Sequence, residues 1–269
     1  MAFGTWGDAV VLGLVEGLTE FVPVSSTGHL LLGAELLGFE GPPGRTFEVA
    51  IQFGAILAVV WLYRAKLFGV AFGLVSEPAD RRFAANVAIA FLPALVLGFT
   101  LHGFIKNVLF NPWVVSVALV AGGIAILWIE RNLPLPRVDD IDRITPLLAL
   151  KIGACQALAM VPGVSRAGAT IMGAMLMGVD RRTATEFSFF LAIPTMLGAT
   201  VYDLWKNRAL LASEDLAVIA VGFVAAFAAA LIVVRAVVGF VARHGFAPFG
   251  WYRIALGSVA LAALALTGG

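Results

Sequence analysis

Long apolar stretches alternate with short polar segments along most of the chain. Six of these stretches can cross a bilayer as helices, because a spanning helix needs about 20 mostly apolar residues. They cover residues 47–63, 84–104, 112–130, 186–204, 215–235 and 250–267. The pattern therefore predicts an all-α polytopic membrane protein with six transmembrane helices.

Two further apolar segments are interrupted in the middle. Residues 8–37 are interrupted at Pro23 and residues 147–178 at Pro162. A proline lacks the amide proton that a helix interior needs, so each interruption ends a helix. Irregular backbone at membrane depth is tolerated only where protein buries it or where it lines a watery cavity. We therefore predict two re-entrant helical hairpins, each entering and leaving the membrane on one side.

A weak internal repeat relates the two interrupted segments. Sliding the chain by 140 residues places Ser25 on Ser165 and Gly28 on Gly168. Each half then contains one hairpin followed by three spans, and an odd number of spans turns the second half upside down. Inverted repeats of this kind place their binding site where broken helices meet. We predict one membrane domain built from two inverted repeats, about residues 1–135 and 136–269.

Composition supports a membrane protein and excludes several other classes. The 269 residues are 61% hydrophobic and 13% charged, with a mean hydropathy of +0.97, whereas soluble domains carry roughly a quarter charged residues. A net charge of +1 without a basic run does not indicate nucleic-acid binding. The single Cys155 excludes an internal disulfide.

Positive charges concentrate in the loops on one side of the predicted spans. That side carries Arg64, Lys66, Arg81, Arg82, Arg131, Arg137, Arg143, Arg181, Arg182, Arg235 and Arg243, with Lys151 and Arg253 at span ends. The other side carries only Arg45, Lys106, Lys206 and Arg208. The positive-inside rule makes the first side cytoplasmic. Both termini and the first hairpin are then predicted to face the periplasm.

The first hairpin carries ionisable groups where the bilayer makes them costly, which indicates a functional site. Glu16 and Glu20 are four residues apart and so share one helix face. Their mutual repulsion is best relieved by a shared cation or a shared proton. Ser25, Ser26 and Thr27 follow as N-cap residues of a second helix, and the free N–H groups of a helix start suit an anion.

The second hairpin adds a cation to this arrangement. Ser165 is placed to cap its second helix, Arg166 stands in the first turn, and Thr170 follows one turn later. A guanidinium beside free helix N–H groups makes a strong oxyanion site. Together with Ser26 and His29, this indicates phosphoryl-transfer chemistry. Magnesium or a similar divalent ion typically binds through one or two carboxylates plus substrate phosphates.

Each of these residues also has a structural interpretation. Arg166 can simply pair with one of the glutamates, since buried charges need partners. His29 can be a hydrogen-bonded structural histidine, and Thr170 can bond a neighbouring helical turn. Gln156 occupies the position that corresponds to Glu16 in the second repeat, and packing or orientation is the role we expect for it.

Three stretches carry a resemblance to a known family. Residues Glu16–Glu20 read EGLTE, residues Pro23–His29 read PVSSTGH, and residues Pro162–Thr170 read PGVSRAGAT. The chain resembles the undecaprenyl-diphosphate phosphatase family (UppP, also called BacA) at these motifs and over essentially its whole length. It departs from the family pattern at Ala167, where a serine is usual, so no hydroxyl role is assigned there.

The resemblance implies removal of the terminal phosphate from undecaprenyl diphosphate, which recycles the lipid carrier of peptidoglycan synthesis. It further implies a divalent cation, a site open to the periplasm in the bacterial inner membrane, and bacitracin resistance on overexpression. Matched by motif, the catalytic residues would be Ser26, His29, Glu20 and Arg166, and the metal ligands Glu16 and Glu20. The phosphate-binding residues would be Arg166, Ser165, Thr27, Ser25 and Thr170.

Several alternatives stay open at this point. Ser26 can attack the terminal phosphorus while His29 or a glutamate takes its proton, or a metal-activated water can attack directly. A lipid-carrier or anion transporter would use the same inverted repeats, and a carrier-binding protein without turnover is a third possibility. The sequence does not decide between Mg2+ and Ca2+, the prenyl chain length, a homodimer, or a role in flipping the carrier lipid.

Overall fold

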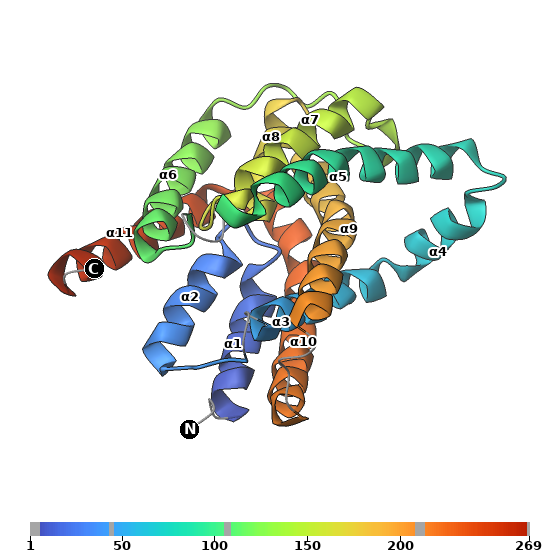
Figure 1. The fold of residues 1–269 in the computed structure, drawn as a ribbon. Coiled ribbons are helices and arrows are strands. Elements are labelled where there is room, and N and C mark those ends of the chain that lie inside the picture. Colours follow the sequence, from blue (N-terminus) through green and yellow to red (C-terminus); the bar gives the residue numbers. More distant parts are fainter. Residues whose placement is uncertain (1–5, 43–45, 105–108, 208–212, 268–269) are drawn as a thin grey trace.

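The computed structural model describes residues 6–42, 46–104, 109–207 and 213–267, and their regular structure is helical apart from one bridge between Val138 and Val179. The elements in chain order are α1 Trp6–Thr19, α2 Ser26–Leu37, α3 Thr46–Leu62, α4 Arg64–Gly73, α5 Pro78–Phe104, α6 Pro112–Arg131, η3 Ile141–Arg143, α7 Pro146–Gln156, η4 Ala157–Met160, α8 Arg166–Leu176, α9 Arg181–Asn207, α10 Ser213–His244 and α11 Ala247–Thr267 (Figure 1).

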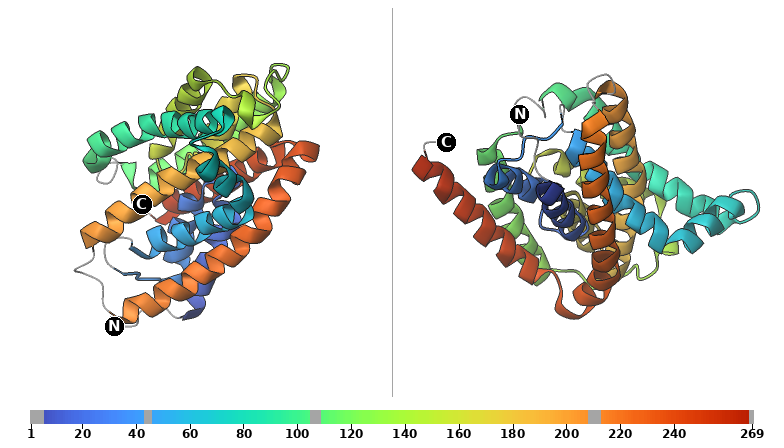
Figure 2. Two further views of the ribbon diagram at one scale, coloured as in Figure 1. Left: turned by 90° about the vertical axis from the view of Figure 1, so that its right-hand side faces the viewer. Right: turned by 90° about the horizontal axis from the view of Figure 1, so that it is seen from below.

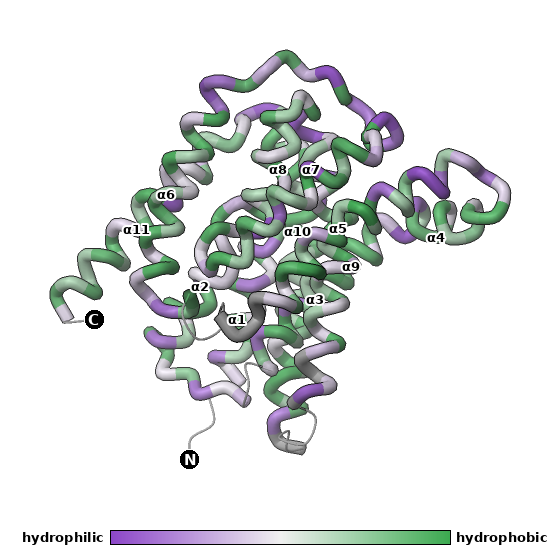
Figure 3. Tube along the Cα trace, turned by 45° about the horizontal axis from the view of Figure 1, so that its top comes forward, coloured by the Kyte–Doolittle hydropathy of each residue, from purple (hydrophilic) through white to green (hydrophobic). Residues whose placement is uncertain are grey.

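Five of these helices, α5, α6, α9, α10 and α11, are long and apolar enough to cross a membrane. The predicted span at 47–63 is α3, which bends by 73° into α4 to make a sixth candidate. Figure 3 shows the apolar character of these helices and the polar loops that join them. The all-α polytopic class is therefore confirmed, but the sequence did not predict α4, which projects from the bundle with the start of α5 (Figure 1).

Both predicted interruptions are present in the chain. The first separates α1 from α2, and the second separates α7 from α8, with the short helix η4 between them. With 14 residues, α1 is the longest of these four helices. A helix of that size spans only about 21 Å, well short of a hydrocarbon core of about 30 Å. The hairpins therefore end inside the protein, where their tips meet.

Each hairpin packs its first helix closely on a long span from the other half of the chain. On the first, a Cβ added to Gly13 of α1 would lie 2.3 Å from the carbonyl oxygen of Gly222 in α10. On the second, a Cβ at Gly153 of α7 would lie 2.1 Å from the carbonyl oxygen of Ala90 in α5. Only glycine allows these approaches. The two glycines are 140 residues apart, in line with the predicted repeats, whose boundaries at 1–135 and 136–269 stay a prediction.

The two hairpins are enclosed by longer helices. The main apolar core joins α3, α7, α8, α9 and α10 through buried residues that include Ala55, Ile152, Ile171, Phe189 and Val237. Figure 2 shows α9 and α10 as long inclined helices on one side of the bundle, with α6 and α11 side by side at another edge. This packing fixes the tips of both hairpins against one another and forms the site described next.

Candidate active site

The second helix of each hairpin begins in the same unusual way. Ser25 and Ser165 precede α2 and α8, and both have positive φ angles, of 72° and 75°. Each side chain accepts a hydrogen bond from the amide three residues on, Gly28 at 3.4 Å and Gly168 at 3.1 Å. Non-glycine residues in this region are strained and gather at functional sites. Both predicted N-caps are therefore confirmed, and each starts a helix at the tip of its hairpin.

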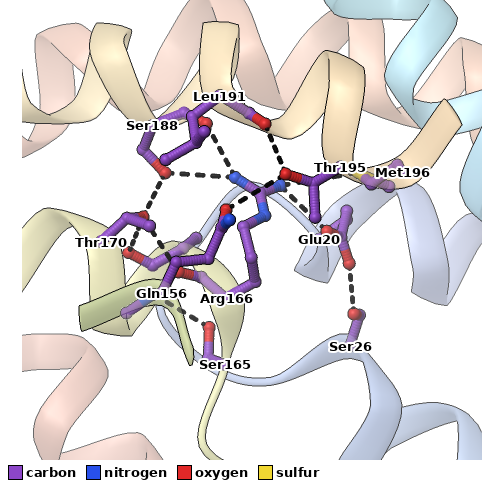
Figure 4. A network of polar contacts seen from close by, with 12 residues as sticks. Glu20, Ser26, Gln156, Ser165, Arg166, Thr170, Ser188, Leu191, Thr195 and Met196 are labelled. Carbon is purple, nitrogen blue, oxygen red and sulfur yellow. Dashed lines mark hydrogen bonds and ion pairs between the residues drawn. The ribbon is translucent and has the colours of Figure 1, made fainter. Parts of the chain in front are cut away.

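Arg166 connects the two hairpins directly. Its Nη2 donates to Glu20 Oε1 at 3.0 Å, and its Nη1 donates to Ser188 in α9, at 2.9 Å to the carbonyl oxygen and 3.1 Å to Oγ (Figure 4). Glu20 accepts a further hydrogen bond at Oε2 from the hydroxyl of Ser26. The side chains of Arg166 and Glu20 are only 12% and 5% exposed. A hydroxyl, a carboxylate and a guanidinium thus form one continuous chain across the hairpin interface.

Thr170 supports this chain from behind. Its hydroxyl contacts Ser188 Oγ at 2.6 Å and donates to the carbonyl oxygen of Arg166 at 2.9 Å. Thr170 is fully buried and does not line the cavity that the other predicted phosphate-binding residues share. Its hydrogen bonds hold the serine that orients Arg166. Ser188 itself was not predicted, since a serine within a span carries no local signal.

A cavity of about 710 Å3 opens beside the Ser26–Glu20–Arg166 chain. Its polar end is formed by Glu20, Ser25, Ser26, Thr27, Gln156, Ser165 and Arg166. Its apolar walls come largely from α5 and α9 and include Phe91, Leu95, Phe99, Met196 and Tyr202. Phe99 is 83% exposed on the outer surface of the bundle, so the apolar part reaches the side that lipid would cover. The cavity suits a ligand with a charged head and an apolar tail.

Glu16 is the most deeply buried ionisable group near this site. It interacts with Glu20 one turn later, and the amide of Glu20 bonds its carbonyl oxygen at 2.9 Å. Neither carboxylate oxygen of Glu16 has a hydrogen-bond partner within the described part of the chain. A buried carboxylate without a partner is costly. The pair therefore fits a shared divalent cation or a shared proton, and the metal site predicted at Glu16 and Glu20 stays a prediction.

The described part of the chain contains no larger cluster of metal-binding side chains. Among the described residues, no three or more His, Cys, Asp or Glu side chains are grouped to hold a metal ion. A cation at Glu16 and Glu20 would therefore need oxygen ligands from the substrate as well. Magnesium commonly binds in this way, through one or two carboxylates and substrate phosphates.

His29 lies to the outside of this arrangement. Its Nδ1 contacts the carbonyl oxygen of Ser25 at 2.8 Å, and its Nε2 contacts the hydroxyl of Tyr252 at 2.7 Å. The two rings are stacked with their centroids 5.5 Å apart. His29 does not line the cavity, although Ser25, Ser26 and Thr27 do. The catalytic role predicted for His29 stays a prediction, while its contacts fix the strained backbone of Ser25.

Arg253 is a buried cation whose role the sequence did not reveal. We counted it as a charge at a span end, but it is 1% exposed inside the bundle. It makes five hydrogen bonds, all to backbone carbonyl oxygens: Pro23 in the first hairpin, Gly163 and Val164 in the second, and Ala118 and Leu119 in α6. All five guanidinium donors are thereby satisfied. Arg253 fixes the breaks of both hairpins to each other.

Replacing Arg253 with leucine is expected to destabilise the folded protein severely. The change removes five hydrogen bonds and leaves the buried carbonyl groups of Pro23, Gly163 and Val164 without a donor among the described residues. Each such group costs about 1–3 kcal/mol. We expect a large drop in the thermal unfolding midpoint in detergent. The matched control is Arg243→Leu, since Arg243 is exposed and bonds only the preceding turn of its own helix. An Arg253→Leu protein as stable as the control would contradict this role.

The chain is similar to known proteins over most of its length. A family model described as bacitracin resistance protein BacA matches residues 9–259. The chain is 60% identical over 252 residues to undecaprenyl-diphosphatase 2 of Paramagnetospirillum magneticum, which covers 94% of this chain and 96% of that protein. It is 57% identical to an undecaprenyl-diphosphatase of Cereibacter sphaeroides, over 95% and 96% of the two chains. A relative with the same name in Sphingopyxis alaskensis is 54% identical, over 95% and 97%.

Proposed function

Because the chain belongs to the bacitracin resistance protein BacA family, we propose that it hydrolyses undecaprenyl diphosphate to undecaprenyl phosphate and inorganic phosphate. The observation that carries this proposal is the chain of contacts from Ser26 through Glu20 to Arg166. It lies at the polar end of a cavity whose other walls are apolar. A nucleophile, a base and an anion-binding cation are thus in contact where a lipid diphosphate fits.

The substrate head binds at the meeting point of the two hairpins. Arg166 Nε is buried without a partner among the described residues, so it is available to a phosphate oxygen. The N-termini of α2 and α8 add backbone N–H groups and favourable helix dipoles. The first isoprenyl units lie along the apolar walls from α5 and α9, and the rest of the tail extends into the bilayer.

Ser26 acts as the nucleophile in the first step. Its hydroxyl already donates a hydrogen bond to Glu20 Oε2, so Glu20 is the base in position to take the proton. The Ser26 oxygen forms a bond to the terminal phosphorus, and the bond from that phosphorus to the bridging oxygen breaks. Undecaprenyl phosphate leaves with the bond electrons on that oxygen, while Arg166 stabilises the charge of the transferred phosphoryl group.

Water completes the reaction in the second step. The carboxylate of Glu20, after passing its proton to solvent or the leaving phosphate, takes a proton from a water molecule. The oxygen of that water bonds to phosphorus, the bond to Ser26 breaks, and inorganic phosphate leaves while the serine regains a proton. This order uses Glu20 as the base in both steps of a covalent phosphoryl transfer.

Glu16 and Glu20 would hold the divalent cation, which supplies positive charge to the phosphate oxygens when bound. Both carboxylate oxygens of Glu16 lack a hydrogen-bond partner among the described residues, which leaves them available for this purpose. Both oxygens of Glu20 already have contacts within the protein, Oε1 with Arg166 and Oε2 with Ser26, so Glu16 would be the main carboxylate ligand of the cation.

We further propose that the site opens to the periplasm, in the bacterial inner membrane. Basic side chains such as Lys66, Arg143 and Arg182 lie at one edge of the bundle in ion pairs with Asp142, Asp139 and Glu186. The positive-inside rule assigns that edge to the cytoplasm. Of the charges counted on the other side, Arg45, Lys106 and Arg208 lie outside the described residues. Recycling of the carrier for peptidoglycan synthesis and bacitracin resistance would follow from this placement.

The products of the reaction test the proposed function. Purified protein in detergent is supplied with undecaprenyl diphosphate, and both lipid and phosphate products are quantified. We expect one inorganic phosphate and one undecaprenyl phosphate per substrate consumed, without further cleavage of the monophosphate. Transport of intact substrate across liposomes without any phosphate release would instead support the carrier-transporter alternative.

Replacing Glu16 with glutamine is expected to weaken the binding of the divalent cation that the reaction needs. At a fixed magnesium concentration the reaction should slow about a hundredfold. The substitution keeps the shape of the side chain but removes one of the two charges that attract the cation. The measurement is the magnesium concentration that gives half-maximal phosphate release, which should rise. Glu35→Gln is the control, because Glu35 is exposed on α2. An unchanged magnesium dependence in the Glu16 variant would contradict the assignment.

A further inference from the structure

Gln156 is a buried polar residue whose side chain faces the cavity. It is the last residue of α7, at the break of the second hairpin, and it is only 2% exposed. It lines the cavity together with Ser26, Arg166 and Thr195. Figure 4 shows its side chain in the same close group as Arg166, with the amide turned toward Thr195. A polar group in this position either serves the protein internally or serves the ligand.

The internal hydrogen bonds of Gln156 do not account for its amide. Its Oε1 has one long contact, 3.4 Å from the hydroxyl of Thr195. That hydroxyl already donates to the carbonyl oxygen of Leu191 at 2.8 Å, and it has only one proton. The nitrogen of the Gln156 amide is buried without a partner among the described residues. Even if the amide turned over and gave one proton to Thr195, its second N–H would stay without an acceptor.

An unpaired buried donor is costly, so it calls for an acceptor that arrives with the ligand. The same cavity contains a second such donor, Arg166 Nε. Two buried donors that have no acceptor in the described part of the chain, both at one end of a cavity, indicate a binding site for an anion rich in oxygen atoms. A diphosphate offers several such oxygens, and each can accept from a neutral amide as well as from a guanidinium.

In the predicted repeat, Gln156 corresponds in sequence to Glu16, which lies 140 residues earlier. The carboxylate of Glu16 is an acceptor only and suits a cation, whereas the carboxamide of Gln156 also donates and carries no charge. A glutamate at position 156 would pair with or compete for Arg166 and would repel the phosphates. The difference between the two residues therefore fits a cation ligand in the first hairpin and a hydrogen-bond donor to the diphosphate in the second.

We infer that Gln156 is a substrate-binding residue that donates a side-chain N–H hydrogen bond to a diphosphate oxygen. The inference rests on the proposed function and adds to it a contact that acts on substrate affinity more than on the chemical step. It differs from the packing or orientation role expected from the sequence. Because the acceptor is charged, losing the bond should weaken binding about tenfold to a hundredfold.

The test compares three variants by direct binding and by kinetics. Gln156→Leu removes both amide groups at similar volume, and Gln156→Glu keeps the shape but presents a carboxylate. Thr200→Val is the matched control, because Thr200 is also buried and its hydroxyl has no partner among the described residues, but it does not line the cavity. The probe for binding is a polyprenyl methylene-diphosphonate, which keeps the terminal oxygens and cannot be cleaved at the bridge. Turnover is measured with undecaprenyl diphosphate.

We expect Gln156→Leu to raise the Kd for the diphosphonate and the KM by about tenfold or more, with kcat changed less than threefold. Gln156→Glu should raise both further, and Thr200→Val should match the wild type. If Gln156→Leu binds the diphosphonate as tightly as the wild type does, the inference is wrong. The proposed function still holds in that case, provided that the wild-type enzyme releases phosphate. If Gln156→Leu does not fold, the isosteric Gln156→Glu decides in the same way. A wild-type protein that binds the probe but releases no phosphate would contradict the proposed function instead.

Discussion

Replacing Arg166 with leucine is expected to lower kcat/KM for undecaprenyl diphosphate by about a thousandfold or more. Removing one preorganised donor from a developing anion typically costs a hundredfold to a thousandfold, and Arg166 supplies a full charge as well. The substitution also leaves the carboxylate of Glu20, the base that Ser26 needs, buried without its cationic partner. The measurement is steady-state phosphate release from purified protein at a fixed concentration of magnesium.

Arg166→Lys separates the chemical effect from folding. Lysine keeps a positive charge for Glu20, so the protein should fold, but its single ammonium cannot replace the fork that contacts both Glu20 and Ser188. We expect a loss of about a hundredfold in this variant, with thermal stability near that of the wild type. Arg143→Leu is the control, since Arg143 forms an exposed ion pair with Asp139 far from the cavity. A turnover rate near that of the wild type in Arg166→Leu would contradict the assignment of Arg166 to the active site.

Replacing Ser26 with alanine is expected to reduce phosphate release by at least about a thousandfold while substrate affinity changes little. Removal of an enzyme nucleophile normally abolishes the covalent route, and only binding and electrostatic contributions remain. The change deletes one oxygen atom, and Arg166 with both helix N-termini still holds the diphosphate. No other hydroxyl among the described residues donates to Glu20, so a substitute nucleophile is not in place.

Ser116→Ala provides the comparison for this variant. Ser116 is also buried, but its hydroxyl donates to Pro112 one turn back in α6, outside the cavity. It should retain the wild-type rate. Substantial turnover by Ser26→Ala would exclude the covalent mechanism and support direct attack by a metal-activated water. Affinity for the uncleavable diphosphonate should stay near the wild-type value in both serine variants.

The spans could be predicted from the sequence because each is a local pattern. The stretches at 112–130 and 250–267 differ from α6 and α11 by only a few residues at their ends. The helix α4 was missed because the 73° bend at Tyr63 follows from tertiary packing and leaves no mark in hydropathy. The breaks at Pro23 and Pro162 were predictable for the opposite reason, since proline acts on the backbone locally.

The candidate site was predictable only as far as its residues stand in contiguous motifs. Glu20 and Arg166 are ionisable groups that are improbable at membrane depth, and Ser26 stands in the same interrupted segment as Glu20, so these residues could be found without a structure. Ser188 and Tyr252 could not, because a serine or tyrosine in a span is ordinary and their partners lie far away in sequence. Arg253 did carry a signal, a charge within a predicted span, but its five carbonyl acceptors come from three separate segments.

The measurement that tests the central claim most directly is a single-turnover experiment with undecaprenyl diphosphate labelled in its terminal phosphate. Excess purified protein is mixed with substrate and quenched at intervals, and label is followed in lipid, protein and inorganic phosphate. The account predicts that label passes through a phosphorylated peptide containing Ser26 and then appears as inorganic phosphate, with neither seen in Ser26→Ala. Release of labelled phosphate by Ser26→Ala at the wild-type rate, or no release by the wild type, would contradict it.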